Sequence, residues 1–413
     1  MRLAWLGPLE DGVSTSTSGQ VPMGVASTED RWVSVGRSSD PHSRAAGRQA
    51  AAEAMARGDA ALILVFCSAA HDLTDLVAGV REVSGGAPLI GSTTAGELTG
   101  EGPSDGGVVV MVLGGPGFSV ATAAATGIGP RLRQAGAEVA TCVNAIAARP
   151  HRVLLMLTDG LAGDHQEILR GAYSVAGAAI PLVGGAAADD LTMAGTHQLH
   201  GGDVLGDSVV AAALGSDAPM GIGARHAWRP FGEPMLVTAS SGDWIHSLDD
   251  EPALDVYLGR LEAPVDCYRD HAAFTRFAMT HPLGLSRRSG ERLRCILKVD
   301  FPNRAISCNA QVPSGAVTSF MECSTAAVLA SAGEACREAT RGLDGLRPIG
   351  LLAIDCIGRR MVLGDGGAAV EVERMLETAP GTPLAGFYSY GEIARVRGGS
   401  GFHSQTLAAL ALS

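Results

Sequence analysis

The chain has 413 residues, more than a single hydrophobic core usually supports, so we expect two domains. Its 46% apolar and 18% charged residues are typical of a globular protein and exclude a disordered one. The net charge of −12 argues against general nucleic-acid binding, which needs a basic surface. No apolar run is long enough to span a bilayer. We therefore expect a cytoplasmic protein whose partners include neither nucleic acid nor a membrane.

Residues 1–22 are predicted to form a disordered tail, because they include a long polar stretch without periodicity. Ordered protein is expected from Met23 onward. The eight cysteines are scattered and form no Cys-x-x-Cys pair. This pattern favours reduced thiols and disfavours both a structural zinc site and covalently attached haem.

The next segment predicts a strand–helix–strand unit. Helices are expected over 44–57 and 73–83, with a buried strand over 61–67 between them. A second strand opens at Pro88, and further strands are expected over 108–113 and 118–123. Because the two central strands would be parallel, their crossover should be right-handed.

The same order returns twice, each time with Pro-Leu-x-Gly at the second strand. The second unit is a helix around 132–148, a strand over 152–157, a helix over 167–176, a strand at Pro181, and strands over 209–214 and 220–227. The third has a strand over 349–354, a hairpin-like excursion over 356–360, a helix over 370–378, a strand at Pro383 and a last strand over 403–412. The predicted fold class is α/β, with repeated strand–helix–strand units in mixed sheets and helices packed on the sheets.

Residues 229–347 break this pattern. They predict short antiparallel strands, a helix over 252–261, a hairpin within 293–309 and an Ala-rich helix over 325–340. We therefore predict one domain over 23–228, which holds two related units, and a second over 229–413.

Three acids follow the second strand of each unit at the same spacing, namely Glu97, Asp190 and Glu392. Ligands of open α/β sheets bind at the carboxyl ends of strands, so these acids are candidate pocket residues. The alternative is that each one caps a turn or helix. The same segments contribute the further candidates Gly91, Ser92, Thr93 and Gly391.

The third copy alone carries tyrosines, Tyr388 and Tyr390, with His403 close behind in the sequence. Residues two apart on a strand share one face, so two phenols, an acid and an imidazole would suit a small polar or zwitterionic ligand. The tyrosines could instead fill a seam between domains.

Two further groups are candidates. One of Arg359 and Arg360 could clamp a carboxylate, but only one, because neighbours on a strand face opposite ways. Asp159, followed by Gly160, lies in a loop with His165 that could be catalytic, although Asp-Gly is first of all a turn signal. A buried Cys356 is favoured over a nucleophilic one. No established enzyme motif accompanies these residues.

At these residues the chain resembles a known family. The segments 64–73 and 88–97 resemble the N-terminal FIST domain, and 281–284, 356–364, 386–394 and 402–407 resemble the C-terminal FIST domain. The resemblance implies a bacterial sensory protein of signal transduction that binds small molecules such as amino acids. Some members are haem proteins that sense nitric oxide and act on histidine kinases. Ser404 and Gln405 depart from the Asn-His or Asn-Gln of many relatives.

The leading hypothesis is a two-domain sensor, not an enzyme, that acts through a separate partner, for which a histidine kinase or another signalling protein is a candidate. Its ligand would contact Tyr388, Tyr390, Glu392, His403 and one of the two arginines. The alternatives are a haem-based nitric-oxide sensor with one axial histidine and an enzyme of unknown reaction. No certain cofactor and no metal site is predicted.

Overall fold

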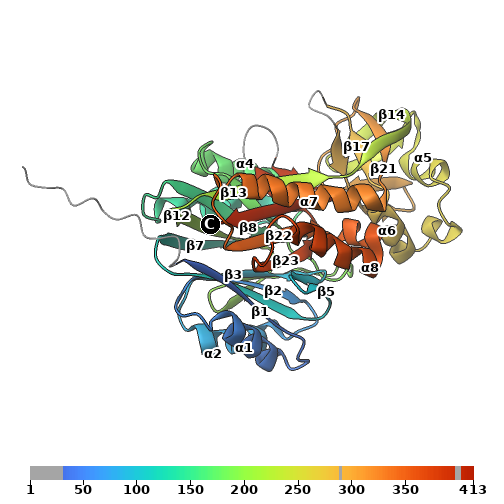
Figure 1. Cartoon of the computed structure of the whole chain (residues 1–413). Coiled ribbons are helices and arrows are strands. Elements are labelled where there is room, and N and C mark those ends of the chain that lie inside the picture. Colours follow the sequence, from blue (N-terminus) through green and yellow to red (C-terminus); the bar gives the residue numbers. More distant parts are fainter. Residues whose placement is uncertain (1–30, 288–290, 396–400) are drawn as a thin grey trace, which may run out of the picture.

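The computed structural model describes residues 31–287, 291–395 and 401–413 (Figure 1). The tail predicted over 1–22 lies outside the described residues. The α/β fold class is confirmed: mixed sheets carry helices on one face. None of the described helices is long and apolar enough to cross a lipid bilayer.

The described residues form three repeats of one unit, the third of which carries an insertion. Repeat 1 comprises β1 (Trp32–Ser38), α1 (Ser43–Ala54), β2 (Ala60–Ser68), α2 (Leu73–Ser84), β3 (Leu89–Thr94), the hairpin β4 (Glu97–Thr99) and β5 (Gly102–Ser104), and β6 (Val108–Gly114). Repeat 2 comprises β7 (Phe118–Thr126), α3 (Leu132–Ala140), β8 (His151–Thr158), α4 (His165–Ala176), β9 (Leu182–Ala186), the hairpin β10 (Gln198–His200) and β11 (Asp203–Leu205), and β12 (Ser208–Ser216). Short 3-10 turns, Gly129–Arg131 and Thr141–Asn144, flank α3.

Repeat 3 has the same order but carries an insertion. It comprises β13 (Met220–His226), α7 (Thr325–Arg341), β22 (Gly350–Cys356), α8 (Ile357–Leu376), β23 (Leu384–Ser389), the hairpin β24 (Glu392–Arg395) and β25 (Phe402–His403), and β26 (Thr406–Leu412). The insertion, residues 229–322, comprises β14 (Arg229–Ser241), β15 (Trp244–Leu248), β16 (Glu251–Pro252), α5 (Ala253–Arg260), a 3-10 turn (Val265–Tyr268), α6 (His271–Met279), β17 (Leu283–Leu285), β18 (Arg292–Arg294), β19 (Ile296–Asp300), β20 (Ala305–Cys308) and β21 (Val317–Glu322). It forms its own antiparallel sheet at one end of the molecule (Figure 1).

Each repeat builds one six-stranded sheet and completes it with a hairpin from another repeat. The strand orders are β1-β6-β2-β3-β10-β11, β7-β12-β8-β9-β24-β25 and β13-β26-β22-β23-β4-β5. The hairpin of repeat 1 therefore joins the sheet of repeat 3, that of repeat 2 joins repeat 1, and that of repeat 3 joins repeat 2. The central pairs β2–β3, β8–β9 and β22–β23 are parallel. This cyclic exchange brings the ends of all three second strands together.

The three sheets share one central core. Alternate residues of each strand point to opposite faces, so Leu62, Leu64 and Phe66 of β2 enter the shared core, while Ile63 and Val65 pack beneath α1 and α2. The strands β8 and β22 divide their side chains in the same way. Continuous apolar runs in the sequence are therefore strands covered on both faces.

Close helix pairs also repeat. A Cβ on Gly79 of α2 would lie 2.1 Å from the carbonyl oxygen of Arg44 on α1. A Cβ on Gly171 of α4 would lie 1.8 Å from the carbonyl oxygen of Arg133 on α3. Only glycine fits at either contact. In both helix pairs, therefore, a glycine of one helix packs against a backbone carbonyl of the other.

Two local predictions were wrong. The excursion expected over 356–360 is the first turn of α8, and the helix is interrupted further on at Gly364, whose φ of 64° is accessible to glycine. The helix expected around 132–148 ends at Ala140 and passes into a 3-10 turn. The boundary between 228 and 229 stays a prediction, and β13, on its N-terminal side, pairs with β26 near the end of the chain.

Candidate functional site

The acids Glu97 and Glu392 hold the exchanged hairpins in place. Glu97 accepts hydrogen bonds from the Thr94 hydroxyl at 2.6 Å and the Gly107 amide at 3.1 Å. Glu392 accepts them from the Ser389 hydroxyl at 2.8 Å and the Thr406 amide at 3.1 Å. Both side chains are fully buried. Burial raises the pKa of Glu97 to about 8 and that of Glu392 well above its ordinary range.

The expectation that Asp190 shares this position is wrong. Glu97 and Glu392 each begin a hairpin and lie opposite the residue after the Gly of Pro-Leu-x-Gly in another repeat. In repeat 2 that place belongs to Gln198, which lies opposite Ser92. Its amide oxygen accepts a hydrogen bond from the Ser208 hydroxyl at 2.5 Å. Residues 190–197 form an extra loop before the hairpin, which is why spacing alone selected the wrong residue.

The neighbouring Asp189, which sequence reasoning missed, closes this loop. Its carboxylate accepts hydrogen bonds from the Thr192 hydroxyl and from the backbone amides of residues 193–195. Tyr390 donates its hydroxyl hydrogen to the same carboxylate and accepts one from the Leu191 amide at 2.8 Å. Tyr390 therefore ties repeat 3 to the loop of repeat 2, as a seam residue would.

Two more predicted site residues are fully buried. The Arg359 guanidinium bonds to Asp355 at 2.7 Å and to Glu371, and it also donates to the Ser331 hydroxyl at 2.9 Å. The Tyr388 ring lies in the core between α8 and the sheet, and its hydroxyl has no hydrogen-bond partner among the described residues. Neither side chain lines any of the cavities described below.

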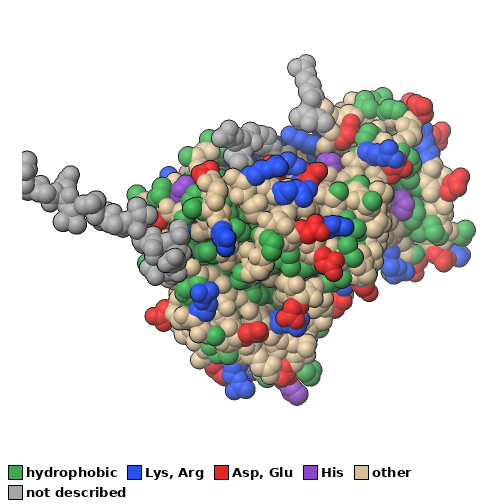
Figure 2. Space-filling model, in the orientation of Figure 1, with side chains coloured by type: hydrophobic (Ala, Val, Ile, Leu, Met, Phe, Trp, Pro, Cys, Tyr) green, Lys and Arg blue, Asp and Glu red, His purple; other side chains and the backbone are tan. Residues whose placement is uncertain are grey.

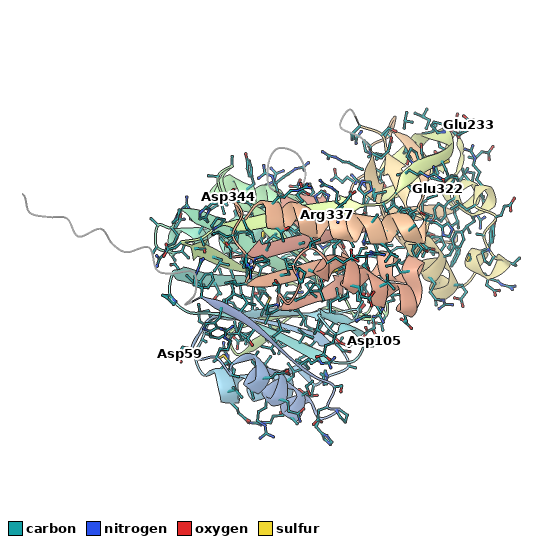
Figure 3. All side chains as sticks on the ribbon, viewed as in Figure 1. Asp59, Asp105, Glu233, Glu322, Arg337 and Asp344 are labelled. Carbon is teal, nitrogen blue, oxygen red and sulfur yellow. The ribbon has the colours of Figure 1, made fainter. Side chains whose placement is uncertain are left out.

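One cavity of about 580 Å³ lies where the three repeats meet, and we call it the junction cavity. It is lined by Ser68, Ala70, Ala95, Asp105, Gly106, Asp190, Leu191, Ile357, Arg360, Met361, Gly364 and Asp365. Two of the predicted site residues, Asp190 and Arg360, line it. Figure 3 shows Asp105 beside α8 at the edge of repeat 1.

The polar groups of the junction cavity come from different repeats. Arg360 of repeat 3 donates two hydrogen bonds to Asp105 of repeat 1, at 2.6 and 2.8 Å, and its guanidinium lies 4.9 Å from the centre of the Tyr388 ring. Asp190 accepts a hydrogen bond from Ser68 at 3.2 Å. Partial burial, with Asp105 and Asp189 nearby, raises the pKa of Asp190. Sequence reasoning missed Asp105, and it missed Ser68 although this residue lies within the segment 64–73 that resembles the N-terminal FIST domain.

The other predicted residues serve the fold. Gly91, Ser92 and Thr93 are buried in β3, and Thr93 accepts a hydrogen bond from the His197 amide at 3.0 Å. Gly391 leaves room for the Phe402 ring, which would lie 2.2 Å from a Cβ at that position.

In the loop that was a candidate for catalysis, the side chains of Asp159 and His165 bond mainly to backbone groups. The Asp159 carboxylate accepts hydrogen bonds from the Leu161 amide and the Thr196 hydroxyl, both at 2.8 Å. The His165 ring contacts the backbone carbonyls of Gly163 and Asp159 at 2.9 and 2.8 Å. Burial lowers the pKa of His165. The two side chains therefore do not form a carboxylate–imidazole pair.

His403 was the remaining candidate for a ligand or for haem. Its Nε2 lies 2.9 Å from the Ala394 carbonyl oxygen, and burial lowers its pKa. It lines a cavity of about 290 Å³ together with His226 and three arginines. A porphyrin needs a large apolar slot, which these polar residues do not form, so haem stays an expectation from the resemblance. In the described residues, no three His, Cys, Asp or Glu side chains gather as a metal site requires.

Two family models match this chain. The FIST N domain matches residues 61–251 and the FIST C domain matches residues 253–395. The chain belongs to the FIST family. FIST domains are sensory domains of signal transduction.

Two relatives are similar over different extents. An uncharacterized protein of Mycobacterium tuberculosis is 27% identical over 395 residues, which are 91% of this chain and 97% of the relative. An uncharacterized protein of Methanocaldococcus jannaschii is 30% identical over 128 residues, which are 29% of this chain and 25% of that protein.

Proposed function

We propose that this FIST protein senses a small zwitterionic molecule, such as an amino acid, bound in the junction cavity. The observation that carries the proposal is the combination of a guanidinium, three exposed carboxylates and an apolar lining in one cavity. Arg360, Asp105, Asp190 and Asp365 supply the charges, and Asp365 lies 3.3 Å from the Arg360 guanidinium. An amino acid presents a carboxylate and an ammonium group only a few ångströms apart, so it needs both kinds of partner.

The ligand carboxylate would bind Arg360. This guanidinium already holds the Asp105 carboxylate through two parallel hydrogen bonds, the geometry that a free carboxylate takes. The Asp105 side chain is 67% exposed, whereas Arg360 is 11% exposed. The arginine is therefore the fixed partner, and Asp105 is the one that a ligand would displace.

The ligand ammonium group would lie near Asp190. This carboxylate is exposed and receives one hydrogen bond, from Ser68, so it keeps free acceptor positions. The side chains of Ala95, Leu191 and Met361 would contact the apolar part of the ligand.

Binding would change how the repeats contact one another. Displacing Asp105 from Arg360 would break an ion pair between the hairpin of repeat 1 and α8 of repeat 3. A ligand shifts an equilibrium between two states only by its difference in affinity for them, and this ion pair supplies such a difference. We propose that a separate signalling protein, such as a histidine kinase, reads the altered arrangement.

The test is calorimetric titration of the full chain with a panel of amino acids. We expect one class of amino acid to bind, and Arg360→Gln and Asp190→Asn each to weaken it by about tenfold or more. Arg337→Gln on α7 and Asp344→Asn are matched controls, because both residues are exposed and do not line the cavity. Asp190 and Asp344 even share a positive φ, 54° and 53°. Equal affinity in the cavity variants and the controls would contradict the proposal.

A further inference from the structure

Two adjoining cavities lie where the insertion meets repeats 2 and 3. Their volumes are about 400 and 290 Å³, and they share no lining residue with the junction cavity. Both are lined by the same five residues, Arg292, Leu293, Arg294, Phe402 and Ser404. We treat them together as the arginine cavity.

The arginine cavity is basic in an acidic protein. Its larger part is lined by Arg170, Arg287, Arg292 and Arg294, against the single acid Asp164. The chain as a whole carries a net charge of −12. Figure 2 shows basic side chains gathered near the place where the insertion meets the repeats. A concave surface lined by one sign of charge concentrates ligands of the opposite sign.

Most of these arginines have no carboxylate partner. Arg170 pairs with Glu167. In the described ranges, Arg287, Arg292 and Arg294 form no ion pair. These three arginines stand against the two acids Asp164 and Glu291 that line the arginine cavity, which leaves an excess of one positive charge.

Arg294 is a partly buried guanidinium without a carboxylate partner among the described residues. Its guanidinium donates to the backbone carbonyl oxygens of Gln311, at 3.2 and 3.3 Å, and of Leu293, at 3.0 Å. Burial lowers its pKa, so the charged form is held there at a cost. The nearby carboxylate of Glu291 accepts hydrogen bonds from the Ser286 hydroxyl, at 2.9 and 3.1 Å, and among the described residues it forms no ion pair with Arg294. An anion in the cavity would offset the cost of this partly desolvated charge.

Strand β18 and the start of α4 set the positions of the side chains that line the arginine cavity. Arg292 and Arg294 lie on the same face of β18 because they are two residues apart. Leu293, between them, anchors the strand against Trp228 and Met321. The first turn of α4 also lines the cavity, but Asp164 already accepts a hydrogen bond from the Gln166 amide at 3.0 Å. The guanidinium groups therefore carry the argument rather than the end of the helix.

We propose that the arginine cavity binds a small molecule that carries a phosphate group. A phosphate monoester has a charge of about −1.5 to −2 at neutral pH, which is opposite in sign to the excess charge of the cavity. Its three oxygens suit the planar forks of several guanidinium groups. A bound phosphate would join β18 of the insertion to α4 of repeat 2.

The test uses the full chain and calorimetric titration with inorganic phosphate, adenosine monophosphate and glycerol phosphate, at constant ionic strength set with chloride. We expect at least one of these compounds to bind. When the titration is repeated at higher chloride concentrations, its affinity should fall. Arg292→Gln should weaken binding by about tenfold or more. Arg337→Gln on α7 should leave it unchanged. Arg292 is preferred to Arg294 for this test because, among the described residues, its side chain makes no hydrogen bond or ion pair, whereas Arg294 donates to two backbone carbonyls.

Each outcome decides the question. Tighter binding of the two esters than of inorganic phosphate identifies an organic phosphate as the ligand, and the reverse identifies phosphate itself. No binding of any probe, or equal affinity in Arg292→Gln, overturns the proposal. Binding of an acidic peptide or of nucleic acid in place of all three phosphates also overturns it. The Asp190→Asn variant should bind phosphate as tightly as the unchanged protein. A failure of the phosphate proposal can therefore be told apart from a failure of the amino-acid proposal.

Discussion

The hairpin of repeat 2 differs from those of repeats 1 and 3 in the residue that begins it and in the loop that precedes it. In repeats 1 and 3, a glutamate begins the hairpin and is buried among hydroxyl and amide donors. In repeat 2, Gln198 takes this structural place and the loop 190–197 precedes it. The acid of this loop, Asp190, is exposed and lines the junction cavity.

The difference shows where a repeated fold gains a site. Two copies use their acid to secure the exchanged hairpin, so it has no free face for a ligand. In repeat 2, the neutral Gln198 secures the hairpin instead. The added loop then places a separate acid, Asp190, in the same cavity as Arg360 of repeat 3. The tyrosine-rich copy, which the sequence singled out, keeps its acid for structure.

The largest expected effect separates the two kinds of acid. Glu392→Ala removes an acceptor from the Ser389 hydroxyl and the Thr406 amide inside the protein, so the free energy of unfolding should fall by about 2 to 4 kcal/mol. Glu97→Ala should behave in the same way. Urea denaturation of each variant measures this loss. A loss below about 0.5 kcal/mol in both would show that the buried acids do not secure the hairpins.

The pH dependence of stability gives a second contrast. The pKa of Glu97 is about 8 in the folded protein, against an ordinary value of 4.5, so the folded state keeps a proton that the unfolded state releases. This acid's contribution to stability is therefore greatest below about pH 4.5 and is lost as the pH rises to about 8. Glu97→Gln should remove up to about 1.4 kcal/mol per pH unit of this decline. Urea denaturation from pH 5 to pH 8 tests this prediction, and parallel curves for the two proteins would contradict it.

The two tyrosines of repeat 3 test the seam between repeats. Tyr390→Phe loses hydrogen bonds to Asp189 and Leu191, so the free energy of unfolding should fall by about 1 to 2 kcal/mol. Tyr388→Phe is the matched control, because its hydroxyl has no partner among the described residues, and it should change stability by less than about 0.5 kcal/mol. Thermal and urea unfolding of both variants provide the comparison. Equal losses would show that the loop is held by other contacts.

The smallest expected effect on stability belongs to Asp190. Asp190→Asn keeps a side chain that tolerates the positive φ and should change the free energy of unfolding by less than about 0.5 kcal/mol. Its effect should appear in ligand affinity instead. A large loss of stability would place Asp190 with the structural acids and end the comparison.

Local sequence patterns predicted much of the fold. Continuous apolar runs such as 61–67 marked the covered strands, and Pro-Leu-x-Gly marked the second strand of each unit. The exchange of hairpins was not predictable, because a short edge strand carries no local signal that names its partner. The interruption of α8 at Gly364 disguised a helix as an excursion for a similar reason: glycine signals a break but not what continues after it.

The candidate site was predictable only in part. Asp190 stood out as an acid beside the repeat motif and Arg360 as one of two arginines that follow a strand, and both line the junction cavity. Asp105 and Ser68 did not, since their role depends on contacts between repeats far apart in the sequence. The same holds for Arg292 and Arg294, which gain meaning only when the insertion lies against repeats 2 and 3. Tyr388 and Arg359 misled because chemical capability in a sequence says nothing about exposure.

The exchange of hairpins also governs how the chain must be made. As the ribosome releases repeat 2, the edge of β9 has no partner, because β24 begins only at Glu392. Unpaired strand edges are templates for wrong association between chains. The nascent protein therefore carries an open β9 edge until β24 has emerged. The sheet of repeat 1 can close earlier, because its hairpin strands β10 and β11 belong to repeat 2, whereas the sheets of repeats 2 and 3 both wait for strands of repeat 3. The hairpin β24–β25 thus completes a sheet whose other strands are synthesised much earlier.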